Sequence, residues 1–412
     1  MIVIKNAEAY APEQAGVLDI VLAGSQIVAM GKNLEIPSAL VEAVVDAQGL
    51  TAVPGFIDGH VHAIGGGGEG GFATRTPELN AGTAFRYGIT TIIGVLGTDG
   101  IARSMETLVA KTYGLRAEGL SAFCLSGSYR VPLTTLTGEL VRDIMFIEPV
   151  LGAGEIALGD HRSSWPTDDE LIRIIADARL GGILSGKAGL VNIHLGDDSR
   201  GFDQLERIFG TMSIPRRQVL PTHCNRTHDV FKQAGRWLAQ GGCIDLTATE
   251  TTDQLSAGKA FYDLCKSFVP LAIVQGHAGS GKERGSKLEG GASDSLNGDC
   301  LHRITITSDA QGSLPRFNEK GECIGLDVGT NRALLKALQE AVLKYGIPLE
   351  HALLPITQTP AELYKLSRKG RLEVSMDADI VLMNSALEPV TVYAQGALVY
   401  ADGELKKKGT FE

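Results

Sequence analysis

Two histidines separated by one residue, His60 and His62, stand at the end of an apolar run over residues 51–58. Alternate residues of an extended segment project to the same face, so both imidazoles can bind one metal ion. Two histidines in a loop are just as often ordinary polar residues. The pair by itself therefore leaves both interpretations open, and the rest of the chain has to decide between them.

Three further strand-like runs each end in a residue that can bind a metal: His194, His223 and Asp309. An additional carboxylate, Glu155, lies in the apolar, glycine-containing segment 151–158. Strands of a parallel barrel deliver the residues at their carboxyl ends to the active site. With the histidine pair, these residues make a set of four histidines and two carboxylates. Such a ligand field suits zinc or a similar divalent ion.

The elements that would position these residues follow the pattern of an α/β protein. Strand-like runs alternate with helical patterns, and this alternation predicts a (β/α)8 TIM barrel. In the helical segment 168–179, Thr167 or Asp168 can cap the amino end. The predicted barrel strands are residues 52–58, 89–95, 121–126, 153–158, 190–195, 218–223, 242–247 and 303–308.

Both chain ends are rich in β-like segments and lie outside the predicted barrel. Each flank is too short to bury a core of its own, so we expect the two to combine in one sheet. We predict a small β domain of residues 1–52 and 376–412, and a barrel domain of residues 53–375 that carries the candidate metal ligands.

A long polar, glycine-rich stretch, residues 276–299, precedes the last predicted barrel strand. Loops of this length are usually functional, and we interpret it as a lid over the barrel mouth. Residues 276–282 match most of a phosphate-binding loop, but Glu283 stands where that motif needs Ser or Thr to hold Mg²⁺. The lid is therefore the better interpretation.

Bulk properties exclude several classes of partner. The net charge of −10 argues against nucleic acid, whose phosphates are bound by clustered Lys and Arg. No apolar run reaches the roughly 18 residues that a membrane span needs, and the amino terminus lacks the pattern of a signal peptide. The six cysteines are scattered and fit reduced thiols, so we expect a cytoplasmic protein.

The order of the candidate ligands resembles that of the amidohydrolase superfamily, and further motifs are similar to those of the isoaspartyl (β-aspartyl) dipeptidases. The resemblance covers essentially the whole chain. Members of that family commonly use a carboxylated lysine as the bridging ligand, but the fourth predicted strand here has no lysine. Glu155 is the candidate substitute. The motifs that carry the resemblance are residues 54–62, 65–69, 74–77, 96–99, 160–163, 221–226 and 408–412.

The resemblance implies a cofactor of two divalent metal ions, with zinc expected, and a hydroxide that bridges them as the nucleophile. Asp309 would bind one ion and act as the general base, and Tyr129 would donate to the developing oxyanion. Glu155 would bridge the ions. The implied metal ligands are His60, His62, Glu155, His194, His223 and Asp309.

For the substrate, the resemblance implies a receptor for each charged group of a dipeptide. Glu69 would hold the free α-amino group, and Arg162 with Arg226 would bind the carboxylate of the leaving residue. The residues implied for the aspartyl α-carboxylate are Gly67, Thr98 and Ser313.

The resemblance implies that the protein is a metallodipeptidase that hydrolyses small β-aspartyl dipeptides. It also implies a homo-oligomer, for which an octamer is one option. Other amidohydrolases are the alternative: a hydantoinase, a dihydroorotase or an N-acylamino-acid deacylase. These would give no reason for Glu69 and the two arginines together. A catalytically silent binding protein is a third interpretation, but such relatives usually lose metal ligands.

Overall fold

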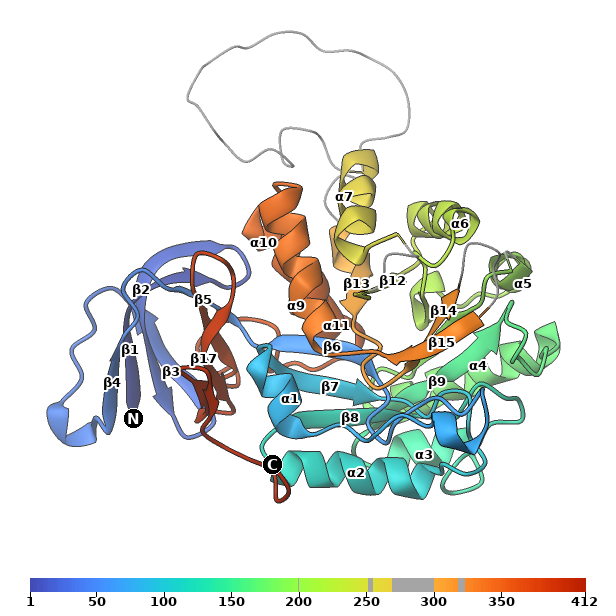
Figure 1. Ribbon diagram of the computed structural model, residues 1–412, viewed down its shortest axis with the longest axis horizontal. Helices are drawn as coiled ribbons and strands as arrows, with labels where there is room; N and C mark the ends of the chain where they lie inside the picture. Colours follow the sequence, from blue (N-terminus) through green and yellow to red (C-terminus); the bar gives the residue numbers. More distant parts are fainter. Residues whose placement is uncertain (199, 251–254, 269–299, 318–322) are drawn as a thin grey trace, which may run out of the picture.

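The computed structural model describes residues 1–198, 200–250, 255–268, 300–317 and 323–412. Figure 1 shows a small β sheet, built from both ends of the chain, lying beside a larger body of strands and helices. The predicted lid and the phosphate-loop-like segment 276–282 lie outside the described residues. Among the described residues, no helix has both the length and the apolar character that a membrane crossing requires.

The larger body is the predicted α/β barrel. Six of its parallel strands form one sheet and two form a parallel pair. β12 packs beside β11, and β13 packs beside β6, so the strands close into a ring. In chain order the strands are β6 (Phe56–Val61), β7 (Ile89–Gly94), β8 (Ser121–Ser126), β9 (Val150–Leu158), β10 (Leu190–Leu195), β11 (Val219–Thr222), β12 (Ile244–Thr247) and β13 (Ile304–Thr307).

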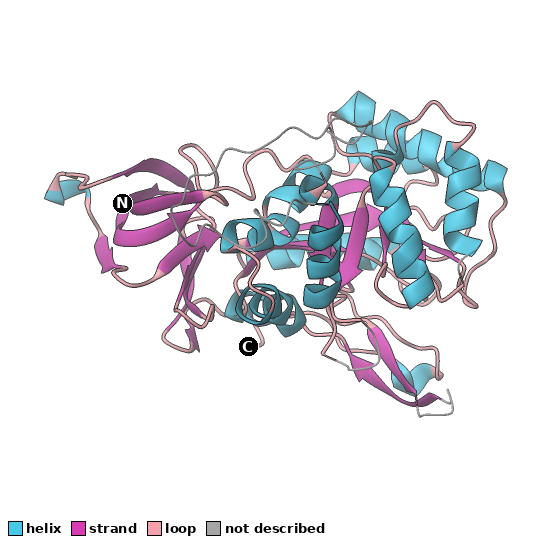
Figure 2. Cartoon of the chain, turned by 90° about the horizontal axis from the view of Figure 1, so that it is seen from above, coloured by secondary structure: helices cyan, strands magenta, loops and turns pink. Residues whose placement is uncertain are grey.

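Helices cover the outside of these strands (Figure 2). The predicted helix at 168–179 is α4, and Thr167 caps it through a reciprocal capping box with Glu170. A hairpin of β14 (Ser313–Phe317) and β15 (Cys323–Val328) follows the last barrel strand. The described α-helices are α1 (Ala81–Arg86), α2 (Met105–Ala117), α3 (Leu140–Phe146), α4 (Asp168–Ser185), α5 (Arg200–Phe209), α6 (His228–Ala239), α7 (Ala257–Phe268), α9 (Arg332–Gln339), α10 (Leu349–Leu353) and α11 (Gln358–Leu363).

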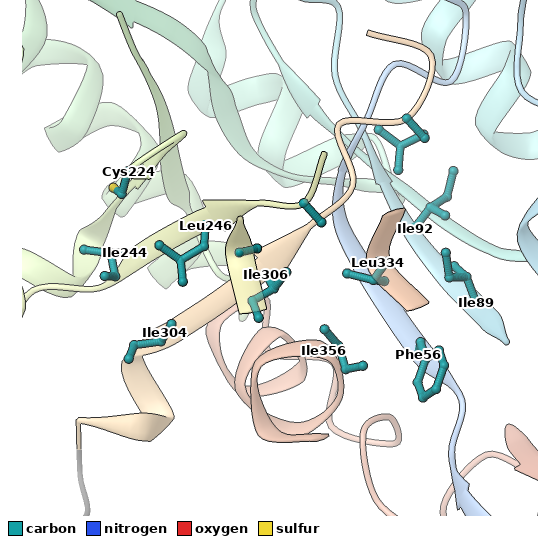
Figure 3. Close-up of a cluster of buried hydrophobic side chains, with 14 of the residues drawn as sticks. Phe56, Ile89, Ile92, Cys224, Ile244, Leu246, Ile304, Ile306, Leu334 and Ile356 are labelled. Carbon is teal, nitrogen blue, oxygen red and sulfur yellow. The ribbon is translucent and has the colours of Figure 1, made fainter. Parts of the chain in front are cut away.

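Alternation along the barrel strands separates an apolar outer face from a partly polar interior. Leu246, Ile304 and Ile306 belong to the hydrophobic cluster that includes helix residues such as Leu334 (Figure 3). The residue between two such positions, Asp245, is fully buried. Its carboxylate accepts hydrogen bonds from three hydroxyl groups, those of Thr222, Thr305 and Thr307, at 2.6, 2.6 and 2.8 Å. The buried carboxylate of Asp245 is thus fully paired inside the barrel.

The small sheet has nine strands among the described residues, and both flanks of the chain contribute to it. The strand predicted over 52–58 is in fact two: β5 joins the small sheet, and only β6 belongs to the barrel. The domain boundaries stay a prediction. The strands are β1 (Ile2–Tyr10), β2 (Gln14–Ala23), β3 (Gln26–Gly31), β4 (Ala43–Asp46), β5 (Thr51–Pro54), β16 (Ile380–Met383), β17 (Pro389–Ala394), β18 (Ala397–Ala401) and β19 (Glu404–Leu405).

A buried lysine links the small sheet to the first residue of a barrel strand. Lys369 Nζ donates to Asp379 Oδ2 at 2.6 Å, to Ser121 Oγ at 2.7 Å and to Asp377 Oδ2 at 2.9 Å. Only 7% of its side chain is exposed. Burial would lower the pKa of Lys369, but the carboxylates of Asp379 and Asp377 raise it, so the ammonium stays charged between them.

We therefore expect Lys369→Met to lower the free energy of unfolding by about 3–5 kcal/mol, because it leaves buried carboxylates without their cation. Denaturant unfolding measures this difference. Lys344→Met is the matched control: Lys344 is 64% exposed and pairs with Glu340 on the same helical turn, so its loss should leave the free energy of unfolding nearly unchanged. Equal effects of the two substitutions would contradict the prediction.

Candidate metal centre and substrate cavity

A bulge in β6 turns the histidine pair into the barrel. Phe56 packs in the outer cluster, so strict alternation would place His60 and His62 on that outer side as well. The register with β7 shifts between Asp58 and Val61, which places one extra residue in β6. Bulges of this kind re-aim side chains next to active sites. Both imidazoles consequently face the carboxylates of Glu155 and Asp309.

Strand β9, which lies across the cluster from β6, carries a bulge of its own. Its register with β10 shifts between Ala153 and Ile156, and one extra residue lies in β9 there. Gly154 has φ +138°, and a Cβ at this position would lie 2.8 Å from the Asn192 backbone oxygen. Only glycine fits such a backbone without strain. The bulge directs Glu155, which is fully buried, towards the histidines.

The Glu155 carboxylate lies at the centre of the cluster and contacts all four histidines. Oε2 is 3.1 Å from His194 Nδ1, 3.3 Å from His60 Nε2 and 3.8 Å from His223 Nε2, and Oε1 is 3.5 Å from His62 Nε2. Asp309 closes the other side, with Oδ1 3.0 Å from His62 Nε2. The six residues expected as ligands therefore come together in one place.

Two triads in this cluster have ligand atoms close enough to hold an ion. The ligand atoms of His60, His62 and Asp309 lie within 4.8 Å of one another, as do those of His60, Glu155 and His223. His194 belongs to neither triad, although its Nδ1 faces Glu155 Oε2 and lies 2.7 Å from the Tyr129 hydroxyl. By the resemblance, His60 and His62 with Asp309 would bind one ion, His194 and His223 would bind the other, and Glu155 would be shared. The first triad matches the first of these sets, whereas the second contains His60 where His194 was expected.

Several atoms of the cluster lack the hydrogen bonds that buried polar groups normally make. Both ring nitrogens of His60, together with Glu155 Oε1 and Asp309 Oδ1, are buried without a partner. Burial would lower the pKa of His60, but the charges of Glu155 and Asp309 raise it to about 10. A divalent cation would satisfy these unpaired nitrogen and oxygen atoms and would balance the carboxylate charge. Imidazole nitrogens and carboxylate oxygens are donors that suit zinc.

Two members of the cluster have an unusual backbone conformation. His223 has φ +63° and Asp309 has φ +50°, in the left-handed region that residues other than glycine seldom adopt. Such conformations cost on the order of 1–3 kcal/mol each and concentrate at functional sites. Burial, with the neighbouring His194 and Arg226, lowers the pKa of His223 to about 3. Its imidazole is therefore neutral, as metal ligation requires.

A cavity of about 770 Å³ opens above the cluster. His62, His194 and Asp309 line it at the metal side. All residues expected to contact substrate line the same cavity: Gly67, Glu69, Thr98, Tyr129, Arg162, Arg226 and Ser313. The structure thus brings the predicted substrate residues together around the predicted ligands, and their roles stay a proposal.

Glu69 is connected to the opposite wall of the cavity, which the sequence did not indicate. Its carboxylate accepts from Ser313 Oγ at 3.0 Å, from Thr98 Oγ1 at 3.2 Å and from Arg162 Nη1 at 3.0 Å. The expected receptor for the amino group and one expected receptor for the leaving carboxylate therefore form an ion pair. Arg226 makes longer ion-pair contacts: its Nη1 lies 3.5 Å from Asp160 Oδ2, and its Nε lies 3.9 Å from Asp197 Oδ1.

Sequence reasoning assigned no role to two residues that hold the cavity walls. Arg103 is buried and donates to the backbone oxygens of Ile64 and Gly66 at 3.2 and 2.7 Å, which fixes the glycine-rich loop. Asp160 is 4% exposed and contacts His194 and both cavity arginines. The motif 160–163 places Asp160 two residues before Arg162, and this spacing was the signal in the sequence that could have indicated Asp160. Nothing local in the sequence indicates that Arg103 reaches back to the loop.

The barrel and its buried cluster of histidines and carboxylates define a hydrolase of the amidohydrolase class, and comparison with known proteins agrees. A model of the amidohydrolase family matches residues 291–405. A beta-aspartyl dipeptidase from Fervidobacterium islandicum AW-1, solved in complex with the beta-Asp-Leu dipeptide, is 40% identical to this chain, covers 98% of both chains and has a TM-score of 0.84. The chain belongs to the beta-aspartyl dipeptidase family.

More distant similarities support the fold. A D-hydantoinase from a Thermus species has a TM-score of 0.66 at 17% identity, over 99% of this chain and 97% of that one. An adenine deaminase from Bacillus velezensis is 29% identical over 43% of this chain, and a dihydroorotase from Streptococcus pyogenes is 32% identical over 26%. These matches span only 30% and 25% of the two curated relatives.

The central position of Glu155 makes its loss a direct test of the metal centre. We expect Glu155→Ala to bind at least one metal ion fewer than the unaltered protein, because the substitution removes the carboxylate that contacts all four histidines. Inductively coupled plasma mass spectrometry of the dialysed proteins measures this. Glutamate needs no carboxylation. Metal-free protein that is reloaded with Zn²⁺ should therefore regain full activity without added bicarbonate.

Glu148→Ala is the matched control, because this carboxylate is exposed and pairs with Arg116 away from the cluster. It should keep the full metal content. Unchanged metal content and turnover in Glu155→Ala would show that Glu155 does not bridge the ions.

Proposed function

We propose that this protein is a binuclear, metal-dependent isoaspartyl dipeptidase that hydrolyses β-aspartyl dipeptides. The observation that carries the proposal is the meeting, in one cavity, of the buried ligand cluster with Glu69 on one side and Arg162 and Arg226 on the other. A dipeptide has a free amino group and a free carboxylate, and the cavity offers an opposite charge for each. The 40% identity to a beta-aspartyl dipeptidase supports the same conclusion.

The proposed cofactor is a pair of zinc ions held by the six clustered residues. Bound divalent ions would lower the pKa of a water molecule towards neutrality and polarise the scissile carbonyl. Asp309 Oδ1, which is buried and has no hydrogen-bond partner, would take the proton of the attacking water. The same carboxyl group would then give that proton to the leaving amine.

Tyr129 is suited to donate a hydrogen bond to the oxyanion. Burial and the charge of Glu155 raise the pKa of this phenol well above its ordinary value, so the hydroxyl stays protonated. The hydroxyl lies 2.7 Å from His194 Nδ1, at the edge of the ligand cluster. A donor in this position would contribute roughly 3–4 kcal/mol, as other oxyanion donors do.

The remaining cavity residues would distinguish a β-aspartyl from an α-aspartyl bond. Glu69 would bind the α-ammonium group, and Arg162 with Arg226 would bind the leaving residue's carboxylate. The residues proposed for the aspartyl α-carboxylate are Gly67, Thr98 and Ser313. In an α-linked dipeptide these charged groups stand at other distances from the scissile carbonyl, so they could not all be paired while that carbonyl meets the cluster. A cytoplasmic location and a homo-oligomeric assembly are further parts of the proposal, carried by the sequence alone.

A panel of substrates tests the function. The zinc-loaded protein should hydrolyse β-Asp-Leu and leave α-Asp-Leu, hydantoin and N-acetyl amino acids essentially uncleaved. Asp309→Asn keeps the shape of the side chain but removes the base, so kcat for β-Asp-Leu should fall by at least about 100-fold. Faster cleavage of hydantoin than of β-Asp-Leu, or near-normal turnover by Asp309→Asn, would reject the proposed reaction or the proposed base.

Glu69 and Arg226 should act on opposite ends of the dipeptide. Glu69→Gln should lower kcat/KM for β-Asp-Leu by roughly 10- to 100-fold, the value of a hydrogen bond to a charged group, but should have little effect on N-acetyl-β-Asp-Leu. Arg226→Met should penalise β-Asp-Leu by a similar factor and spare β-Asp-leucinamide, which lacks the carboxylate. If each variant lost activity equally on all three compounds, both side chains would be structural only.

A further inference from the structure

Asp160, just beyond the end of β9, is surrounded by hydrogen-bond donors. Its Oδ1 accepts from Arg162 Nε at 2.9 Å and from the Arg162 backbone N–H at 2.8 Å. Its Oδ2 lies 2.8 Å from Arg162 Nη2, 3.0 Å from His194 Nε2 and 3.5 Å from Arg226 Nη1. One buried carboxylate thus contacts an expected metal ligand and both arginines of the cavity.

The neighbours of His194 Nε2 determine where the imidazole proton lies. Two of them are guanidinium nitrogens, Arg162 Nη2 and Arg226 Nη1, each 3.3 Å away, and a guanidinium can only donate. Asp160 Oδ2 is an acceptor at 3.0 Å. A proton on Nε2 therefore pairs with Asp160, and the lone pair is left on Nδ1. That nitrogen lies 2.7 Å from the Tyr129 hydroxyl, which can donate to the lone pair, and it faces Glu155 Oε2 at 3.1 Å on the side of the ligand cluster.

We propose that Asp160 is a positioning residue that fixes the Nε2–H tautomer of His194 and so prepares Nδ1 to bind a metal. Without an acceptor at this point, the two guanidinium groups would favour a lone pair on Nε2. The proton would then lie on Nδ1 and point at Glu155. The nitrogen that should bind the metal would have no free lone pair. This inference rests on the proposed binuclear function and adds to it the residue that selects the ligand's tautomer.

The same carboxylate holds both arginines at the cavity wall, so Asp160 connects the metal centre to the site proposed for the leaving carboxylate. An amide in its place cannot serve all these donors. If the Asp160→Asn oxygen faces Arg162 Nε, the amide NH₂ meets His194 Nε2; in the flipped orientation, the NH₂ meets Arg162 Nε and the backbone N–H. Either orientation sets a donor against donors.

The test measures Zn²⁺ affinity directly. The metal-free full-length protein and its Asp160→Asn variant are titrated with Zn²⁺ against a chromophoric chelator, and kcat and KM are measured on β-Asp-Leu and β-Asp-leucinamide. Loss of a carboxylate behind a metal-binding histidine typically costs about 10- to 100-fold in metal affinity or activity, and we expect a loss of this size for one of the two ions. At limiting zinc, activity should fall on both substrates, including the amide that has no carboxylate.

Asp197→Asn is the matched control. Asp197 also lies beside Arg226, at 3.9 Å, but it is 76% exposed, and its only described ion pair is with that arginine. Its zinc affinity should equal that of the unaltered protein. Asp160→Glu, which keeps a carboxylate, should recover part of the affinity lost in Asp160→Asn, and it provides a second variant if the amide variant does not fold.

The outcomes separate this inference from the function on which it rests. If the unaltered protein binds no Zn²⁺, the proposed function fails first. If it binds two ions and Asp160→Asn or Asp160→Glu binds them with unchanged affinity, the tautomer role is overturned. The same holds if Asp160→Asn only lowers the melting temperature, or if it loses activity solely on β-Asp-Leu, as expected for Arg226→Met.

Discussion

The burial of one carboxylate, that of Glu155, constrains the geometry of the whole site. A fully buried carboxylate is costly unless cations or donors surround it, and here four imidazoles do so. Glutamate is short compared with a carboxylated lysine, so the strand that carries it must approach the cluster. Gly154 provides that approach, because its missing Cβ lets the bulged backbone lie against Asn192. The bulge of β6 on the other side of the cluster then brings His60 and His62 to the same carboxylate.

The fold and the ligand set could largely be predicted from the sequence, whereas the backbone bulges that bring the ligands together could not. His194, His223 and Asp309 follow strand-like runs, and position at the end of a parallel strand is a property that sequence reveals. A bulge is not such a property: period-two alternation would have placed His60 on the outer side with Phe56. The division of residues 51–61 into β5 and β6 escaped prediction for a similar reason, since both pieces are apolar and only pairing partners distinguish them.

Contacts between charged side chains were the other part that sequence could not supply. Glu69 and Arg162 are 93 residues apart, and neither has a local pattern that predicts their ion pair. Asp160 was visible as part of a motif, but its contact with His194 depends on the packing of β9 against β10. Long-range pairing of this kind follows from tertiary structure, so a resemblance can name the residues while leaving their mutual contacts unknown.

The Glu69–Arg162 pair also bears on how the cavity would select its substrate. Both groups are partly buried, with side chains 20% and 18% exposed, so separating them without replacement leaves two poorly solvated charges. A dipeptide that brings an ammonium group to Glu69 and a carboxylate to Arg162 replaces each lost partner. A ligand with only one of these charges pairs one side and leaves the other unsatisfied. Only a singly charged amide would leave one of the two side chains unpaired and so incur the cost of separating them. The pair would therefore discriminate against such amides, in addition to the contacts that a bound dipeptide gains.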